Sequence, residues 1–238
     1  ADVRRRILPR KESVMPDYFT HIIAAEKIYG ALDEKYRRII AENRTLYLLG
    51  AQGGDIFFFY GLNYKHNAGR MLHRENAFEL FEKLKDGDPA YCAGWATHYA
   101  LDCTVHPFVY AWEEKHSGLF IHQRYERDLG LYVSRKCGVR RTILPRERIL
   151  EYTFAICDSI KKVLPYVTAA GVAGCLKRHF IYTRRVFRAK KQKYSLNCDY
   201  SQAYLAFERG CQLGVKAVES VLDKNIDPQI FDKSFLQK

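Results

Sequence analysis

Histidine and carboxylate side chains recur at four-residue spacing in the first half of this chain. The clearest run is His98-x-x-x-Asp102-x-x-x-His106. Each four-residue step advances a helix by about 40°, so these three side chains are expected on one stripe. The flanking residues are largely apolar, and buried ionisable groups are costly unless they are paired or bind a metal. The run therefore predicts either a metal site or a hydrogen-bonded polar network in the core.

A second pair, His122-x-x-x-Glu126, has the same spacing. Together with His106, it would provide three nitrogen and oxygen ligands that zinc accepts, and one coordination position would stay open. An open position is typical of catalytic zinc rather than structural zinc. A pair at this spacing can equally lie on a solvated helix face, so the pair alone does not decide between the two interpretations.

Three further candidates lie upstream of this region. Asp55 follows Gly53 and Gly54, in a loop flexible enough to bring a carboxylate close to a metal, although Asp55 could instead cap a helix. His21 and His73 fall in segments with helical periodicity. The other histidines, at 66, 116 and 179, belong to no matching spacing and are expected in packing or surface roles.

Apolar residues recur at three- and four-residue spacing almost everywhere, and alternating patterns typical of strands are scarce. This pattern predicts an all-α fold, with one domain over 15–238 and an N-terminal extension over 1–14 that precedes Met15. Pro107 disfavours helical geometry at His106, so we expect a helix to end at His106, which would face a different ion from His98. The expected helices are 18–31, 74–84, 90–101, 108–115, 120–136, 146–164, 169–191 and 200–222.

Composition limits the class of protein and its partners. No apolar run approaches the ~20 residues needed to span a bilayer, and no apolar segment of the kind found in secretion signals follows the basic N-terminus. The seven cysteines include no C-x-x-C pair, which favours reduced thiols and a cytoplasmic location. The net charge of +12 predicts an anionic partner, either a phosphate ester, a nucleic acid or a lipid surface.

A basic segment near the C-terminus is a further candidate for contact with an anionic partner. Residues 177–191 interleave aromatic side chains with cations at helical spacing, as would suit peripheral contact with acidic lipid or with a nucleic-acid backbone. The segment could also be an ordinary solvated helix in which Phe180, Val186 and Phe187 form a buried stripe.

One ordered set of motifs is shared with a known family. It comprises His21, Gly53-Gly54-Asp55, His73, Thr97-His98-Tyr99-Ala100-Leu101-Asp102, His106-Pro107 and His122-x-x-x-Glu126. Over about residues 15–130, this set resembles the zinc-dependent phospholipase C family, whose all-helical fold also includes single-strand nucleases. The resemblance implies a multi-helical domain of the phospholipase C and nuclease type.

The resemblance also implies a set of two or three zinc ions. One zinc would be held by Asp55, His73, His98 and Asp102. A second would be held by His106, His122 and Glu126. A third would use His21 and a bridging Asp102, and in the family it is completed by the N-terminal amine, which Pro16 could offer if the chain began there. With residues 1–14 attached, the third site is expected to be weakened or empty.

The activity that follows from the resemblance is hydrolysis of a phosphoester, including those of phospholipids, by a metal-activated water. Asp55 is the candidate for orienting or deprotonating that water. Two alternatives stay open on the sequence. One is a nuclease or nucleotidase on the same scaffold, and the other is a noncatalytic helical binding protein that keeps the metals for stability.

Overall fold

The computed structural model describes residues 18–61, 67–139, 143–144, 146–188 and 193–235. Every regular element in these ranges is helical and none is a strand, which confirms the predicted all-α class. The elements are α1 (Tyr18–Ala31), α2 (Glu34–Glu42), α3 (Arg44–Gly50), the 3-10 helix η1 (Gly53–Phe59), α4 (Ala68–Arg74), α5 (Ala77–Leu84), α6 (Pro89–Lys115), α7 (Ile121–Lys136), α8 (Arg146–Glu151), α9 (Thr153–Lys161), α10 (Ala169–Arg188) and α11 (Ser201–Leu222).

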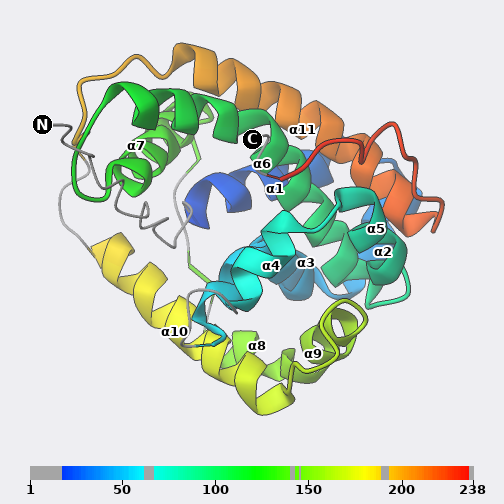
Figure 1. Cartoon of the computed structure of the whole chain (residues 1–238). Helices are drawn as coiled ribbons and strands as arrows, with labels where there is room; N and C mark the ends of the chain where they lie inside the picture. Colours follow the sequence, from blue (N-terminus) through cyan, green and yellow to red (C-terminus); the bar gives the residue numbers. More distant parts are fainter. Residues whose placement is uncertain (1–17, 62–66, 140–142, 145, 189–192, 236–238) are drawn as a thin grey trace, which may run out of the picture.

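The long helix α6 is the centre of the arrangement, because α1, α3, α7 and α11 all pack on it. Figure 1 shows α11 running along α6, with α8, α9 and α10 on the opposite side of the molecule. The start of α6 is well defined by its sequence. Pro89 occupies the first turn, and the Asp88 carboxylate accepts hydrogen bonds from the backbone N–H groups of Ala90 and Tyr91 at 2.9 and 3.1 Å.

The prediction that a helix ends at His106 is wrong, because α6 continues through Pro107 to Lys115. A proline inside a helix removes one hydrogen bond and crowds the preceding turn, at about 3 kcal/mol. Packing on both sides of Pro107 offsets this. Before Pro107, Gly94 lies against the backbone of α3, and after it Trp112 packs on Tyr125 of α7 with ring centroids 5.7 Å apart. The site residues on α6 therefore share one continuous helix.

Other helix boundaries also differ from the sequence prediction. The predicted helix 74–84 corresponds to α5, which begins at Ala77 because the Asn76 side chain caps it by accepting from the Glu79 N–H, and α4 was not predicted. The predicted helix 146–164 divides into α8 and α9, and α2 and α3 were not predicted at all. Residues 1–17 lie outside the described residues, and so do His66 and the end of the basic segment, 189–191.

Residues 177–188 of the basic segment form the C-terminal half of α10, and the buried stripe expected at Phe180, Val186 and Phe187 can be compared with the structure at Phe180 alone. Phe180 is only partly buried, whereas His179 and Thr183 are buried. The side chains of residues 186–188 are outside the described set. Lys177, Arg178, Arg184 and Arg185 are exposed, so this part of α10 is a solvated basic face. No described helix is long and apolar enough to cross a bilayer.

Candidate metal centre

The eight residues singled out from the sequence come from five elements and converge on the middle of α6. His98, Asp102 and His106 project from α6 itself. His21 comes from α1, Asp55 from η1 and His73 from α4, while His122 and Glu126 come from the first two turns of α7. We call His21, Asp55, His73, His98 and Asp102 the upstream cluster, and His106, His122 and Glu126 the downstream cluster.

Ligating atoms in the upstream cluster lie at the spacing expected around a shared ion. The Nε2 atom of His73 lies 3.2 Å from Asp55 Oδ1 and 3.3 Å from His98 Nε2, and His98 Nε2 lies 3.2 Å from Asp102 Oδ2. Two atoms bound tetrahedrally to zinc at 2.0–2.1 Å are roughly 3.4 Å apart. His73, His98 and Asp102 therefore form a group that could hold one ion, and Asp55 adjoins this group through His73.

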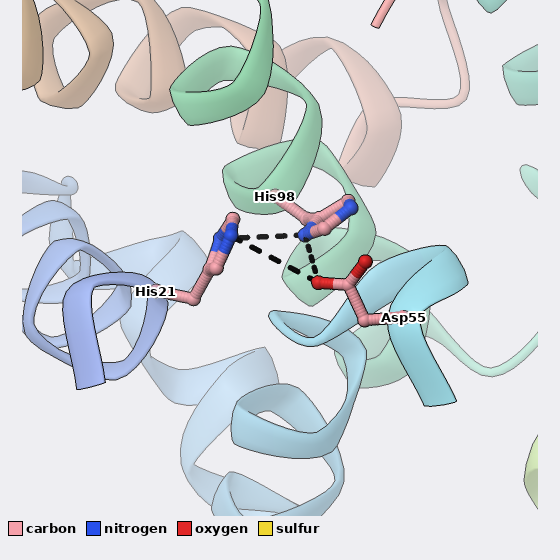
Figure 2. A group of neighbouring side chains, drawn as sticks. All are labelled: His21, Asp55 and His98. Atoms are coloured by element: carbon pink, nitrogen blue, oxygen red, sulfur yellow. Dashed lines mark hydrogen bonds and ion pairs between the residues drawn. The ribbon is translucent and has the colours of Figure 1, made fainter. Parts of the chain in front are cut away.

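His21 faces both carboxylates of the upstream cluster. Its Nε2 atom lies 3.4 Å from Asp102 Oδ1 and 4.0 Å from Asp55 Oδ2, and its Nδ1 atom lies 3.3 Å from His98 Nδ1. Figure 2 shows His21, Asp55 and His98 converging from α1, η1 and α6. The sequence prediction paired His21 with Asp102 alone, whereas in the structure His21, Asp55 and His98 form a group that could hold an ion.

The downstream cluster is organised around Glu126. Its Oε1 atom lies 3.4 Å from His106 Nε2 and 3.1 Å from His122 Nε2. His106 Nδ1 lies 3.7 Å from Asp102 Oδ1, so the two clusters are neighbours on α6. The three residues His106, His122 and Glu126 form a group that could hold a metal ion, as their spacing predicted.

Glu113 is a member of this region that the sequence analysis did not identify. Its Oε2 atom lies 3.3 Å from His122 Nδ1, so each ring nitrogen of His122 faces a different carboxylate. A carboxylate on the far nitrogen of a metal-binding histidine fixes the tautomer and the orientation of the ring. Glu113 reaches His122 across the turn between α6 and α7, and no spacing within one helix could have indicated that contact.

Several polar atoms of both clusters are buried without a hydrogen-bond partner. These are both carboxylate oxygens of Asp55, Oδ2 of Asp102, Oε2 of Glu126 and Nδ1 of His106. Asp128 provides the contrast within the same protein, because its Oδ2 accepts from the backbone N–H groups of Ser195 and Leu196 at 2.5 and 2.8 Å. A buried carboxylate without donors is unfavourable by itself, so the clusters suit a cation as the missing partner.

Comparison with known families places the chain in one of them. The model of the family described as zinc dependent phospholipase C matches residues 20–170. The chain belongs to the zinc-dependent phospholipase C family. Every residue of both clusters lies inside the match, which extends past residue 130, where the resemblance read from the motifs ended. No curated protein and no solved structure matches the chain.

Protonation equilibria in this phospholipase C family member differ among the histidines of a single cluster. Burial acts against the charged form of His73, but the hydrogen bond and charge of Asp55 raise its pKa to about 9. Burial lowers the pKa of His21 to about 3 and that of His98 well below its usual value, which leaves neutral imidazoles with lone pairs available to a metal. Burial also raises the pKa of Asp102 to about 7. In the downstream cluster burial acts against the charged form, yet the Glu126 carboxylate raises the pKa of His122 to about 10.

Two glycines of η1 allow the histidines of the upstream cluster to approach. A Cβ atom on Gly53 would lie 2.1 Å from His98 Cδ2, and one on Gly54 would lie 2.5 Å from His73 Cε1. Gly53 also has φ +47°, in the left-handed region that favours glycine. The Gly-Gly pair forms a tight turn on which the two imidazole rings rest, rather than the flexible loop expected from the sequence.

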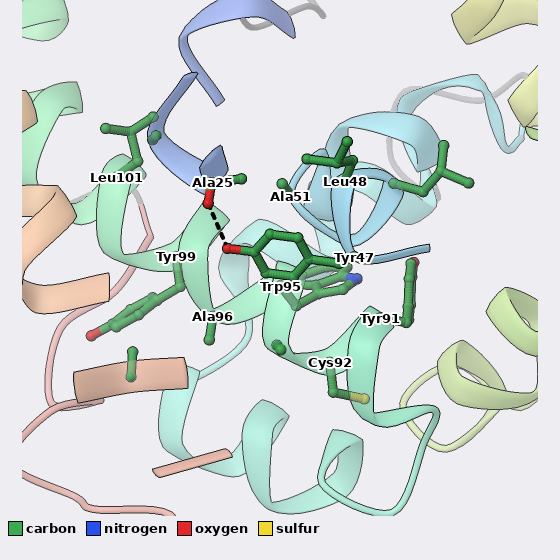
Figure 3. Packing of buried hydrophobic residues seen from close by; sticks show 14 of the residues in the cluster. Ala25, Tyr47, Leu48, Ala51, Tyr91, Cys92, Trp95, Ala96, Tyr99 and Leu101 are labelled. Carbon is green, nitrogen blue, oxygen red and sulfur yellow. Dashed lines mark hydrogen bonds between the residues drawn. The ribbon is translucent and has the colours of Figure 1, made fainter. Parts of the chain in front are cut away.

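Packing behind the upstream cluster holds its helices close together. A Cβ on Gly94 would lie 2.1 Å from the Tyr47 carbonyl oxygen, so α3 and α6 are in direct backbone contact there. The Tyr47 hydroxyl donates to the Ala25 carbonyl at 2.8 Å, which ties α3 to α1. Figure 3 shows Tyr47 with its hydrogen bond to Ala25, in the core that also contains Trp95. Trp95 is fully buried and its ring centroid lies 5.9 Å from that of His98, which limits the positions open to His98.

A small cavity lies between the two clusters. Its volume is ≈ 20 Å³, and its polar lining consists of Thr20, His21, Asp102, His106 and Glu126. A space of this size accommodates about one water molecule or one ion. Asp102 and His106 line it from α6, so it adjoins residues of both clusters.

Proposed function

We propose that this chain is a zinc-dependent phosphoester hydrolase of the phospholipase C type, in which the two clusters hold two or three zinc ions. The observation that carries the proposal is the set of buried carboxylate oxygens without donors, surrounded by imidazole nitrogens at 3.2–4.0 Å. Nitrogen and oxygen ligands in this mixture suit zinc better than magnesium or calcium, which prefer oxygen alone.

The distances support part of the division of ligands that the resemblance implied. His73, His98 and Asp102 form one possible metal-binding group and His106, His122 and Glu126 form another, whereas Asp55 is grouped with His21 and His98. One zinc is assigned to Asp55, His73, His98 and Asp102, and a second to His106, His122 and Glu126. His21 and the second oxygen of Asp102 are assigned to a third, beside the cavity. Zinc bound here would activate a water by lowering its pKa towards ~7 and would stabilise developing negative charge on the phosphoester.

We assign the role of positioning or deprotonating the water to Asp55. Its two oxygens face different histidines, with Oδ1 3.2 Å from His73 Nε2 and Oδ2 3.8 Å from His98 Nδ1. One oxygen can therefore serve a metal while the other accepts a hydrogen bond. Asp55→Asn keeps the shape and one acceptor oxygen, so turnover should fall by about 10²-fold while at least half of the zinc is retained. Steady-state kinetics and elemental analysis of the same sample measure both, and a parallel loss of zinc and turnover would make Asp55 a ligand only.

The substrate class is tested with three soluble probes: a short-chain phosphatidylcholine below its micellar concentration, a single-stranded oligonucleotide, and a phosphomonoester. We expect the phosphatidylcholine to be hydrolysed at the bond between glycerol and phosphate, because the family is named for that activity. Faster hydrolysis of the oligonucleotide would indicate a nuclease on the same scaffold. Bound zinc with no turnover of any probe would indicate a noncatalytic metal-stabilised protein.

The Gly53-Gly54 turn leads to a further expected result. Gly54→Ala would place a methyl group 2.5 Å from His73 Cε1, so His73 must move away from Asp55 and His98. We expect loss of about one equivalent of zinc by elemental analysis, although no ligand is replaced. Gly174→Ala on α10 is the matched control, because nothing lies within 4 Å of its Cβ. It should keep all zinc and raise stability by about 0.5–1 kcal/mol. Full zinc content in Gly54→Ala would contradict the assignment of His73.

Glu113 is expected to act on zinc affinity through His122. Glu113→Gln removes the charge beside His122 Nδ1 but leaves the ligand atoms of the downstream cluster in place. Partners of this kind typically contribute 10–100-fold to metal affinity, and we expect a loss in that range, measured by competition with a chromophoric chelator. Glu114→Gln is the control, since Glu114 is the next residue on α6 and is exposed. Equal zinc affinity in the two variants would exclude this role for Glu113.

A further inference from the structure

An exposed apolar pair lies at the turn between α6 and α7. Leu119 is 84% exposed and Phe120 is 67% exposed. Single exposed apolar side chains are common on soluble proteins. Among the described residues, however, these are the only two adjacent large apolar side chains that are both exposed. Two neighbouring side chains of this size in water form a feature that needs an explanation.

The backbone conformation of Phe120 also indicates that this residue has a role other than folding. Phe120 has φ 56° and ψ 32°, the left-handed region, which is uncommon for any residue with a bulky side chain. It is also the N-cap of α7, yet it offers no side-chain hydrogen bond to the first turn. Asn would suit both the conformation and the cap better. A residue poorly suited to its local geometry indicates that the phenyl ring serves something other than folding.

The turn is anchored at its base rather than loosely attached. The His116 ring stacks on Trp112 with ring centroids 3.6 Å apart, and His116 Nδ1 lies 3.0 Å from the Trp112 carbonyl oxygen. On the other side, the Arg124 N–H donates to the Phe120 carbonyl at 2.9 Å. Leu119 and Phe120 are therefore presented to solvent from two fixed helix ends.

The same two helix ends carry the downstream cluster. His122 is two residues after Phe120, and Glu126 is six residues after it, a rise of roughly 9 Å along α7. Apolar faces of interfacial helices enter a bilayer by about 5–10 Å, to the boundary between headgroups and acyl chains. Insertion of the turn to that depth would bring the downstream cluster to the level of the lipid headgroups.

From these observations we infer that Leu119 and Phe120 form a membrane-inserting wedge that docks the metal clusters on a phospholipid surface. The inference rests on the proposed function, since a bilayer is the partner of an enzyme that cleaves phospholipids. The net charge of +12 favours an anionic lipid surface and opposes self-association. Two side chains also bury too little area for a stable dimer, which needs about 800 Å² per partner.

The test is sedimentation with vesicles of mixed phosphatidylcholine and phosphatidylglycerol, using the whole chain with its zinc. The variant is Leu119→Ser/Phe120→Asn, in which Asn tolerates the left-handed backbone. The control is Phe154→Ser, because Phe154 is 72% exposed but lies on α9, in a different part of the molecule (Figure 1). We expect the double variant to bind vesicles at least about tenfold more weakly, while the control binds as the native chain does.

Melting temperature and zinc content, measured on all three proteins, separate docking from folding. Equal vesicle binding by the double variant and the native chain would overturn the wedge, and so would a native chain that does not bind. Equal losses in the double variant and in Phe154→Ser would overturn it too, because the effect would then be one of general hydrophobicity. Vesicle sedimentation measures binding and does not depend on turnover. The hydrolase proposal is tested by a different experiment, and it fails if soluble phosphatidylcholine is not cleaved.

Discussion

Asp102→Asn is expected to abolish phosphoester turnover and to remove at least one equivalent of zinc. Asp102 is the upstream residue that adjoins the downstream cluster, with one oxygen 3.2 Å from His98 Nε2 and the other 3.4 Å from His21 Nε2. The second oxygen also lies 3.7 Å from His106 Nδ1. Asn keeps the volume of the side chain but removes the charge that a bridging ligand supplies. Activity should fall more than about 100-fold. This exceeds the roughly 10–100-fold loss that is typical when a residue that only orients a metal ligand is replaced.

The matched control for this variant is Asp128→Asn. Asp128 is also fully buried, but its carboxylate accepts backbone N–H groups of Ser195 and Leu196 and belongs to neither cluster. We expect Asp128→Asn to lower the melting temperature and to keep its zinc, because it loses hydrogen bonds to a charged acceptor. Elemental analysis and calorimetry on both variants give the comparison. Zinc retained in full by Asp102→Asn would show that Asp102 is not a zinc ligand.

Much of the candidate site could be predicted because its largest part is local. His98, Asp102 and His106 share one helix at four-residue spacing, and His122 and Glu126 share the next. Helical periodicity alone places such residues on common faces, whatever the rest of the fold does. The convergence of His21, Asp55 and His73 depends instead on how α1, η1 and α4 pack against α6. Only the resemblance to a family could indicate that, because no spacing relates residues on separate elements.

The features that were missed depend on packing between distant segments. Pro107 is a helix breaker by its own chemistry, and α6 continues past it because other helices pack along both of its halves. The role of Gly53 and Gly54 is visible only once His98 and His73 lie against them. Glu113 reaches His122 across a turn. Each case is a contact between elements, which the sequence of either element leaves undetermined.

Removal of zinc by a chelator is expected to lower the melting temperature by at least about 15 °C. A ligand present at a thousandfold over its Kd stabilises the folded state by about 4 kcal/mol per site. For a chain of this length, each kcal/mol corresponds to about 2–4 °C, so two occupied sites account for the shift. The buried carboxylates without donors add to the effect, because without a cation nothing offsets their desolvation. Scanning calorimetry with and without chelator measures it.

Two comparisons test whether the change in melting temperature is due to zinc at these sites. One adds back zinc or magnesium after chelation, and the other repeats the chelation with Asp102→Asn. Zinc should restore the melting temperature, while magnesium should not, because five of the eight assigned ligands are imidazoles and magnesium prefers oxygen. In Asp102→Asn, the chelator should shift the melting temperature by about half as much or less, since one site or more is already lost. A native chain whose melting temperature does not respond to chelator would show that the buried clusters are stable without metal. The pKa of Asp102, raised by burial to about 7, would then indicate how they persist, through a proton shared with the histidines in place of an ion.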